Sequence, residues 1–163
     1  MSSPPQKTYT GGCHCSFLRY SLLTADISTA QFTKCNCTIC HKINRLSLSV
    51  PRSALTILSP TNAENTTSSD NESEGGSING VPSYTFGSGR MTNYFCSKCG
   101  IHCFSSGSYE WEGKLVQSFS VNAVTLDADQ GVDFRAVKTV YWDGLHDNWT
   151  AGSADKPYEG GCF

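Results

Sequence analysis

Apolar and polar residues alternate along several short stretches of the chain, which is the pattern of half-buried β-strands. In residues 46–50, apolar side chains occupy one face and serines the other. The same alternation in residues 16–23 places apolar side chains on one side of a strand. The apolar positions of the two stretches are Leu46, Leu48 and Val50, and Leu18, Tyr20 and Leu22. Both stretches are predicted to pack one face on a core.

Two further stretches, 114–121 and 133–140, are rich in β-branched and aromatic residues and are predicted as strands. Helical periodicity nowhere extends beyond two turns, and a single helical turn is expected around residues 39–43. We therefore predict a mainly β fold class, with antiparallel sheets, long loops and few short helices.

Residues 61–80 differ in composition from the rest of the chain. They carry four acidic residues, no Lys or Arg, and almost nothing apolar. Such a segment buries too little surface to offset its ordering entropy, which predicts a flexible loop. Apolar runs flank it on both sides, so we expect an acidic insertion within a single domain that spans residues 1–163.

Charge and composition exclude several classes of partner. The formal net charge of −2 gives no reason to expect a nucleic acid or an anionic membrane. No apolar run is long enough to span a bilayer, and residues 1–12 contain no apolar stretch typical of a secretory signal. We expect a cytoplasmic protein, and in a reducing compartment clustered cysteines indicate metal ligands or catalytic thiols rather than disulfides.

Seven of the nine cysteines fall in three tight groups. Zinc bound by thiolates requires sulfurs roughly 3.8 Å apart, which Cys-x-Cys and Cys-x-x-Cys spacings can provide. Gly100 can adopt the left-handed conformation that ends such a turn. Groups of two, three and two thiols predict one metal site with four ligands and one with three. Spacing alone leaves open which Cys-x-Cys pair joins the late Cys-x-x-Cys, and it leaves iron possible, although the absence of other redox signals favours zinc.

Three motifs in order, "GGCHC" followed by "RY", then "CNCTICHK", then "FCSKCG", resemble the glutathione-dependent formaldehyde-activating enzyme (GFA) family, also called the CENP-V/GFA domain. The resemblance covers roughly residues 9–150 and implies a β-rich, zinc-stabilised scaffold with two zinc ions per chain. It implies a structural zinc held by Cys13, Cys15, Cys96 and Cys99. It also implies a catalytic zinc held by Cys35, Cys37 and Cys40.

The sequence departs from the family pattern at positions that concern the substrate more than the metals. Ser16 stands where a glycine commonly follows the first Cys-x-Cys, and Asn36 stands where histidine is frequent. The acidic insertion is longer than the usual connection. Residues 141–149, "YWDGLHDNW", resemble the family only loosely and are expected to shape part of the pocket.

Three thiolates on a zinc dication leave a net charge near −1, which makes the metal a weak Lewis acid that favours a soft sulfur as its fourth ligand. The resemblance implies a carbon–sulfur lyase or synthase that acts on glutathione, or other thiol, adducts of small carbonyl compounds. The implied reaction is of the S-(hydroxymethyl)glutathione type, with glutathione as co-substrate. A nearby acid or base would move the proton on the carbonyl oxygen.

Other side chains are weaker candidates for a role in this chemistry. His41 and His102 each follow a cysteine motif and could move the proton, although a place beside the metal ligands or on the surface is the preferred interpretation for both. Lys42 could bind a carboxylate of a peptide-like thiol. Cys103 is interpreted as a small buried apolar residue and Cys162 as a free thiol in a tail, and either could supply a fourth ligand to the second metal.

One segment and one aspartate in the second half of the chain are assigned structural roles. Residues 141–149 are interpreted as a rim packed on the core in preference to a wall of the substrate site. Asp127 is interpreted as the end of a strand in preference to a catalytic carboxylate.

Three other classes of function also use cysteine-bound zinc. A relative recruited to another small molecule in specialised metabolism would keep the metals without glutathione. A non-catalytic zinc scaffold would bind proteins, but such a branch is expected to carry a basic or proline-rich extension, and the first ten residues are nearly neutral. A zinc nucleobase deaminase requires a His-x-Glu motif, and none of the four histidines is followed by one. The sequence names no protein partner.

Overall fold

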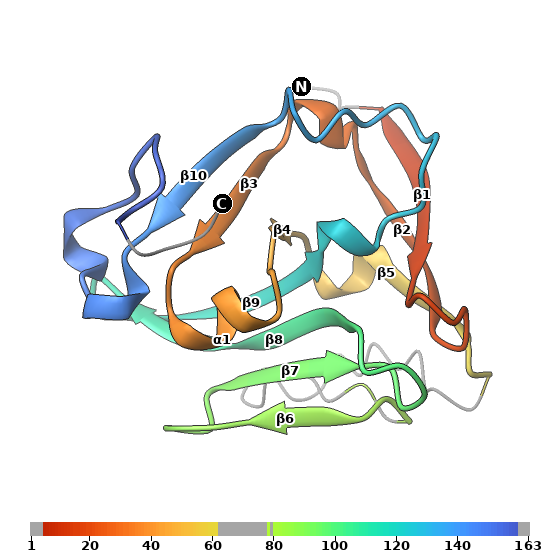
Figure 1. Ribbon diagram of the computed structural model, residues 1–163, viewed down its shortest axis with the longest axis horizontal. Coiled ribbons are helices and arrows are strands. Elements are labelled where there is room, and N and C mark those ends of the chain that lie inside the picture. The colour runs from red at the N-terminus through yellow and green to blue at the C-terminus, as the bar shows by residue number, and fades with distance from the viewer. Residues whose placement is uncertain (1–4, 62–77, 79, 160–163) are drawn as a thin grey trace.

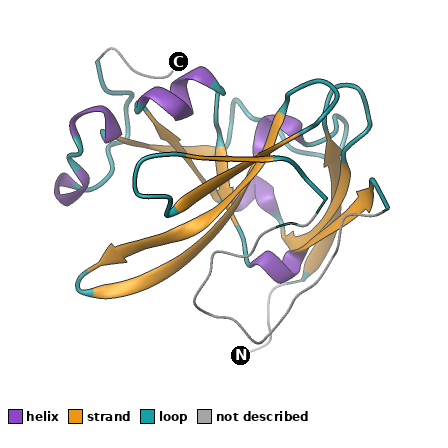
Figure 2. Cartoon of the chain, turned by 90° about the horizontal axis from the view of Figure 1, so that it is seen from below, coloured by secondary structure: helices purple, strands orange, loops and turns teal. Residues whose placement is uncertain are grey.

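The computed structural model describes residues 5–61, 78 and 80–159 of the chain, and strands dominate it (Figures 1 and 2). The strands are β1 (Gln6–Gly12), β2 (Arg19–Ala25), β3 (Gln31–Cys35), β4 (Ser47–Ser49), β5 (Leu55–Ser59), β6 (Ser83–Thr85), β7 (Met91–Phe95), β8 (His102–Trp111), β9 (Lys114–Asn122) and β10 (Lys138–Trp142). The helical turns are α1 (Thr38–Lys42), η1 (Ile27–Thr29), η2 (Arg52–Ala54), η3 (Ala123–Thr125), η4 (Gly144–His146) and η5 (Trp149–Ala151). The mainly β fold class is confirmed.

The strands form two sheets. The smaller has the order β1-β2-β5, and the larger has the order β10-β3-β4-β9-β8-β7-β6. Neighbouring strands are antiparallel except β3 and β10, which are parallel. The larger sheet is therefore mixed, and the expectation of antiparallel pairing holds for every described pair but this one.

The hydrophobic core lies between the two sheets. Tyr20 of the smaller sheet meets Phe104 of the larger one edge to face, with ring centroids 5.0 Å apart. Both predicted amphipathic faces are buried in this core, as the alternation requires: Leu18, Tyr20 and Leu22 from one sheet, and Leu46, Leu48 and Val50 from the other.

Two other sequence predictions are confirmed and one is corrected. Strand β9 covers 114–121, and α1 lies where a single helical turn was expected. The strand predicted over 133–140 begins only at Lys138. The side chain of Asp133 accepts a hydrogen bond from the backbone N–H of Arg135 at 3.0 Å, and this local bond favours a turn. Most of the predicted acidic insertion, residues 62–77 and 79, lies outside the described part of the chain.

The face of the larger sheet that points away from the core is polar. Ser49, Ser120 and Ser105 are paired across β4, β9 and β8, so their side chains share this face. Arg45, which follows α1, donates to Ser120 Oγ at 2.7 Å. The end of α1 therefore lies against the polar face. Within the described part of the chain, no helix is both long and apolar enough to cross a membrane.

Candidate metal centres and the adjoining pocket

Four cysteines from two distant turns converge at one end of the molecule. Cys13 and Cys15 follow β1, Cys96 and Cys99 follow β7, and their sulfur atoms all lie within 4.8 Å of one another. Cys15 Sγ is 3.5 Å from Cys13 Sγ and 3.7 Å from Cys96 Sγ. These separations are close to the roughly 3.8 Å edge of a zinc–thiolate tetrahedron, so the four donors fit a four-coordinate zinc ion.

Backbone geometry holds each of these turns in shape. Leu18 donates its N–H to Cys13 Sγ at 3.2 Å, and Gly100 donates its N–H to Cys96 O at 2.9 Å. Gly100 has φ +73°, the left-handed conformation predicted for it. Ser16 has φ +60°, which explains why glycine suits this position in the family.

The thiols of this cluster differ in how readily they ionise. Burial raises the pKa of Cys13 to about 12, whereas hydrogen bonds from the backbone of Ile101 and Cys15 lower the pKa of Cys99 to about 6. A bound cation would draw the buried thiol into its thiolate form, which couples metal binding to proton release. Cys103 is fully buried in the core near this cluster, as predicted, and burial raises its pKa to about 12.

Three more cysteines form a second cluster at the end of β3. Cys35 ends the strand, Cys37 precedes α1 and Cys40 lies within it, and their sulfurs are within 4.8 Å of one another. The Cys35 and Cys40 side chains hydrogen-bond to Cys37 Sγ, which lowers the pKa of Cys37. Among the described residues no fourth His, Cys, Asp or Glu joins this cluster, and Cys162 lies outside them.

Residues 141–149 pack against this cysteine loop instead of forming a rim on the hydrophobic core. Asn36, between two of the thiols, is buried and donates from Nδ2 to Asp143 Oδ1 at 2.7 Å. Its Oδ1 accepts the N–H of Leu145 at 2.8 Å. A Cβ added at Gly144 would lie 2.5 Å from Cys35 Sγ, so glycine is required for this close approach. The sequence-based interpretation of this segment is therefore corrected.

The same segment presents a histidine held by a carboxylate. His146 Nδ1 lies 2.9 Å and 3.0 Å from the two oxygens of Asp143. The Asn36 amide, and then His146, hold the pKa of Asp143 below its usual range. The His146 side chain is 66% exposed, so the imidazole is open to a ligand while its Nδ1 is fixed. Sequence reasoning missed this pair, and its one local signal is the spacing of three between Asp and His.

The residues that the sequence predicted to assist proton transfer or substrate binding do not lie together. His41 and Lys42 are exposed on α1. His102 is buried, its Nε2 lies 3.0 Å from Ser105 Oγ, and burial lowers its pKa to about 4. Contrary to the prediction, Asp127 does not end a strand but follows η3, and it forms an ion pair with Arg19.

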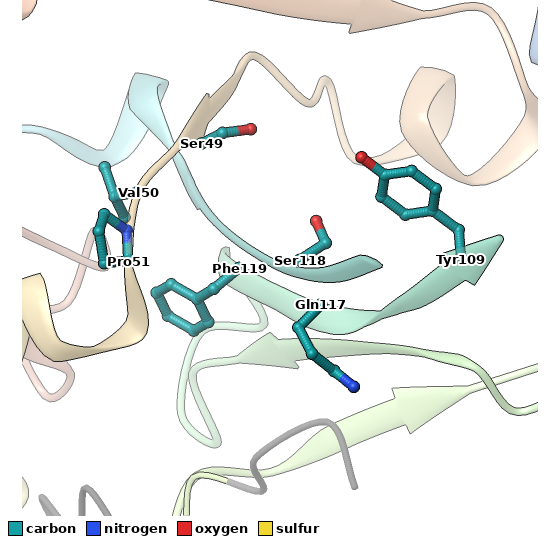
Figure 3. Close-up of a pocket in the computed structure, with 7 residues that line it drawn as sticks. All are labelled: Ser49, Val50, Pro51, Tyr109, Gln117, Ser118 and Phe119. Atoms are coloured by element: carbon teal, nitrogen blue, oxygen red, sulfur yellow. The ribbon is translucent and has the colours of Figure 1, made fainter. Parts of the chain in front are cut away.

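An open pocket of about 250 Å³ lies on the polar face of the larger sheet. Figure 3 shows the hydroxyl groups of Ser49, Ser118 and Tyr109 turned toward the same space. Ser118 and Ser120 lie on one face of β9, and Ser120 is bonded to Arg45, whose N–H donates to Cys40 O at 2.9 Å. The pocket and the anchor of the second cluster therefore share one face of β9, at Ser118 and Ser120 respectively. Its lining residues are Ser49, Val50, Pro51, Tyr109, Gln117, Ser118 and Phe119.

Two comparisons relate this chain to known proteins. A family model described as glutathione-dependent formaldehyde-activating enzyme matches residues 8–143. The crystal structure of a Rhodobacter sphaeroides protein is similar with a TM-score of 0.51, at 20% sequence identity over 82% of this chain and 98% of that one. This second likeness concerns the fold.

Proposed function

Because this chain belongs to the family of glutathione-dependent formaldehyde-activating enzymes, we propose that it is a zinc-dependent carbon–sulfur lyase or synthase. In the synthetic direction a thiol adds to a carbonyl compound. The carbon–sulfur bond forms, the carbon–oxygen π bond breaks, and the thiol proton ends on the carbonyl oxygen. Glutathione is the thiol that we assign, and the cytoplasm, where thiols stay reduced, is the compartment.

The observation that carries this proposal is the three-thiol cluster, which has no fourth protein ligand among the described residues. We assign Cys13, Cys15, Cys96 and Cys99 to a structural zinc and Cys35, Cys37 and Cys40 to a catalytic zinc. A zinc ion with three thiolates and a vacant position would hold a substrate sulfur as thiolate.

Residues of the chain itself supply the remaining parts of the reaction. To His146, fixed through Nδ1 by Asp143, we assign the transfer of a proton to or from the carbonyl oxygen. It replaces His41 and His102 in this role, since His102 is buried and bonded to Ser105. Lys42, exposed at the end of α1, is assigned to a carboxylate of the thiol substrate.

Exchange NMR spectroscopy on formaldehyde and glutathione tests the proposal. The zinc-loaded parent should accelerate formation and decay of S-(hydroxymethyl)glutathione, and Cys37→Ala should return the rate to that of the uncatalysed reaction. The matched control is Thr38→Ala, a truncation at an exposed position of the same helix. A fully zinc-loaded parent that neither binds glutathione nor accelerates the exchange would refute the assignment.

A further inference from the structure

All three tryptophans of the chain lie in one row that begins at the three-thiol cluster. A Cβ placed on Gly144 would lie 2.5 Å from Cys35 Sγ and 2.8 Å from Trp149 Cη2, so the sulfur and the edge of this ring flank the same point. The Trp142 ring is 6.1 Å from Trp149, and the Trp111 ring is 6.3 Å from Trp142. The row therefore extends from the thiols to the end of β8.

The three rings come from separate elements and are not part of the hydrophobic core. Trp142 ends β10, where it is paired with Cys35 in the parallel ladder. Trp111 ends β8, and Trp149 begins η5. Trp111 and Trp149 are each 42% exposed. The two ends of the row therefore keep exposed apolar surface, of the kind that ligand sites present.

The row continues into the pocket on the polar face. Tyr109 stands two residues before Trp111 on β8, so the two side chains point to the same side of the sheet. Tyr109 lines the pocket of about 250 Å³, opposite the hydroxyls of Ser49 and Ser118 (Figure 3). A ligand held at the thiols thus has flat apolar rings beside it and hydroxyl groups beyond them.

We propose that this tryptophan row, Trp149, Trp142 and Trp111, binds the carbonyl-derived half of the substrate, and that this half carries an aromatic ring. The inference rests on the proposed function, because the row adjoins Cys35. Formaldehyde has no surface that could occupy the row, whereas an aromatic aldehyde bonded to a sulfur at the cluster would stack its ring on indole. The preferred adduct is therefore that of a thiol with an aromatic aldehyde.

Three probes that share parts of such an adduct test the inference on protein loaded with Co²⁺, whose absorption reports thiolate coordination. Phenylmethanethiol carries the sulfur and the ring, 2-mercaptoethanol carries the sulfur alone, and phenylmethanol carries the ring alone. We expect both thiols to change the cobalt absorption, with phenylmethanethiol binding at least tenfold more tightly and changing the tryptophan emission.

Variants connect this preference to the row. Trp149→Ala, which removes the ring whose edge flanks Cys35 Sγ, should reduce the preference for phenylmethanethiol to less than threefold. Trp111→Ala lies at the far end of the row, leaves the surroundings of Cys35 unaltered, and should reduce the preference by a smaller factor. Tyr84→Ala is the matched control, since Tyr84 is an exposed aromatic residue on β6 that stacks on Phe86 outside the row. It should keep the full preference.

Two results would overturn the inference. The first is equal affinity of the two thiols for the parent. The second is tryptophan emission that changes with protein concentration and does not change when phenylmethanethiol is added. That result would mean that a second copy of the chain covers the row. The proposed function fails separately. In that case neither thiol changes the cobalt absorption, while phenylmethanol still shifts the tryptophan emission of the parent and not that of Trp149→Ala. The row would then bind aromatic rings, and the lyase assignment would be wrong.

Discussion

Asn36 and Asp143 are joined by a buried hydrogen bond of 2.7 Å that ties the second cysteine cluster to the segment covering it. The amide of Asn36 is satisfied on both sides, because its oxygen accepts the N–H of Leu145. The carboxylate of Asp143 in turn fixes His146. One side chain between two thiols therefore determines where the proposed proton-transfer group stands.

Removal of this bond should weaken both stability and metal binding at the second cluster. Asn36→Ala leaves a buried carboxylate without its main donor, which costs about 2 kcal/mol for a hydrogen bond to a charged group. Urea denaturation and zinc stoichiometry measure the effect. Asn148→Ala is the matched control, since it makes the same truncation in the same segment and Asn148 forms no side-chain cap. An unchanged urea midpoint for Asn36→Ala would show that the bond is dispensable.

Metal removal should proceed in two phases. A chromogenic chelator is expected to take zinc first from the three-thiol cluster, to which the described residues supply only three ligands, and more slowly from the four-thiol cluster, whose Cys13 and Cys96 are buried. Cys37→Ala should abolish the fast phase and leave the slow one. Cys99→Ala should remove the slow phase and lower the melting temperature, because the four thiols connect the ends of β1 and β7. A single phase in the parent would contradict two distinct sites.

His146 should contribute to turnover more than to binding. Without a positioned proton donor the rate of adduct formation is expected to fall about 100-fold in His146→Ala, with little change in KM. His41→Ala, an exposed histidine on α1, should change the rate by less than twofold. Steady-state kinetics of the two variants tests this difference. Equal losses of rate in both variants would exclude His146 as the proton-transfer group.

The ion pair of Arg19 and Asp127 should give the fold a measurable dependence on acid pH. Hydrogen bonds from Arg19 and then Thr10 lower the pKa of Asp127 from 3.8 to about 2. Because the folded-state pKa is the lower one, the stabilisation is complete above pH 4 and is lost as the pH falls toward 2. With both side chains about one-third exposed, it amounts to about 1 kcal/mol.

Asp127→Asn tests this ion pair. The difference between this variant and the parent in the free energy of unfolding should shrink as the pH falls from 4 to 2. Because zinc loss at acid pH affects both proteins alike, it does not contribute to this difference. Arg19→Gln should show the same pH dependence, and the double variant should add little to either change. A difference that stays constant over this range would exclude Asp127 as its source.

Local sequence patterns predicted those parts of the molecule that depend on local geometry. The alternation at Leu46, Leu48 and Val50 predicted a buried strand face, because successive side chains in a strand point to opposite sides. The groups of two, three and two cysteines likewise indicated two clusters, since spacing within a turn determines whether sulfurs can converge. The same reasoning placed Cys103 in the core, where it is fully buried.

The parts that sequence reasoning missed depend on contacts between distant residues. The parallel pairing of β3 with β10 joins strands separated by residues 36–137, and no local pattern specifies such a partner. Residues 141–149 carried a visible group of aromatic and polar side chains, yet their place against the cysteine loop depends on that pairing. The role of Asp143 and His146 followed only from the three-dimensional structure.

The parallel pairing of β3 with β10 also sets an order of events during synthesis on the ribosome. All seven clustered thiols have been translated once residue 99 is in the chain. The segment that covers the second cluster follows more than forty residues later in the sequence. The three thiols of the second cluster are therefore present in the nascent chain before β10 and the segment that covers them have been made.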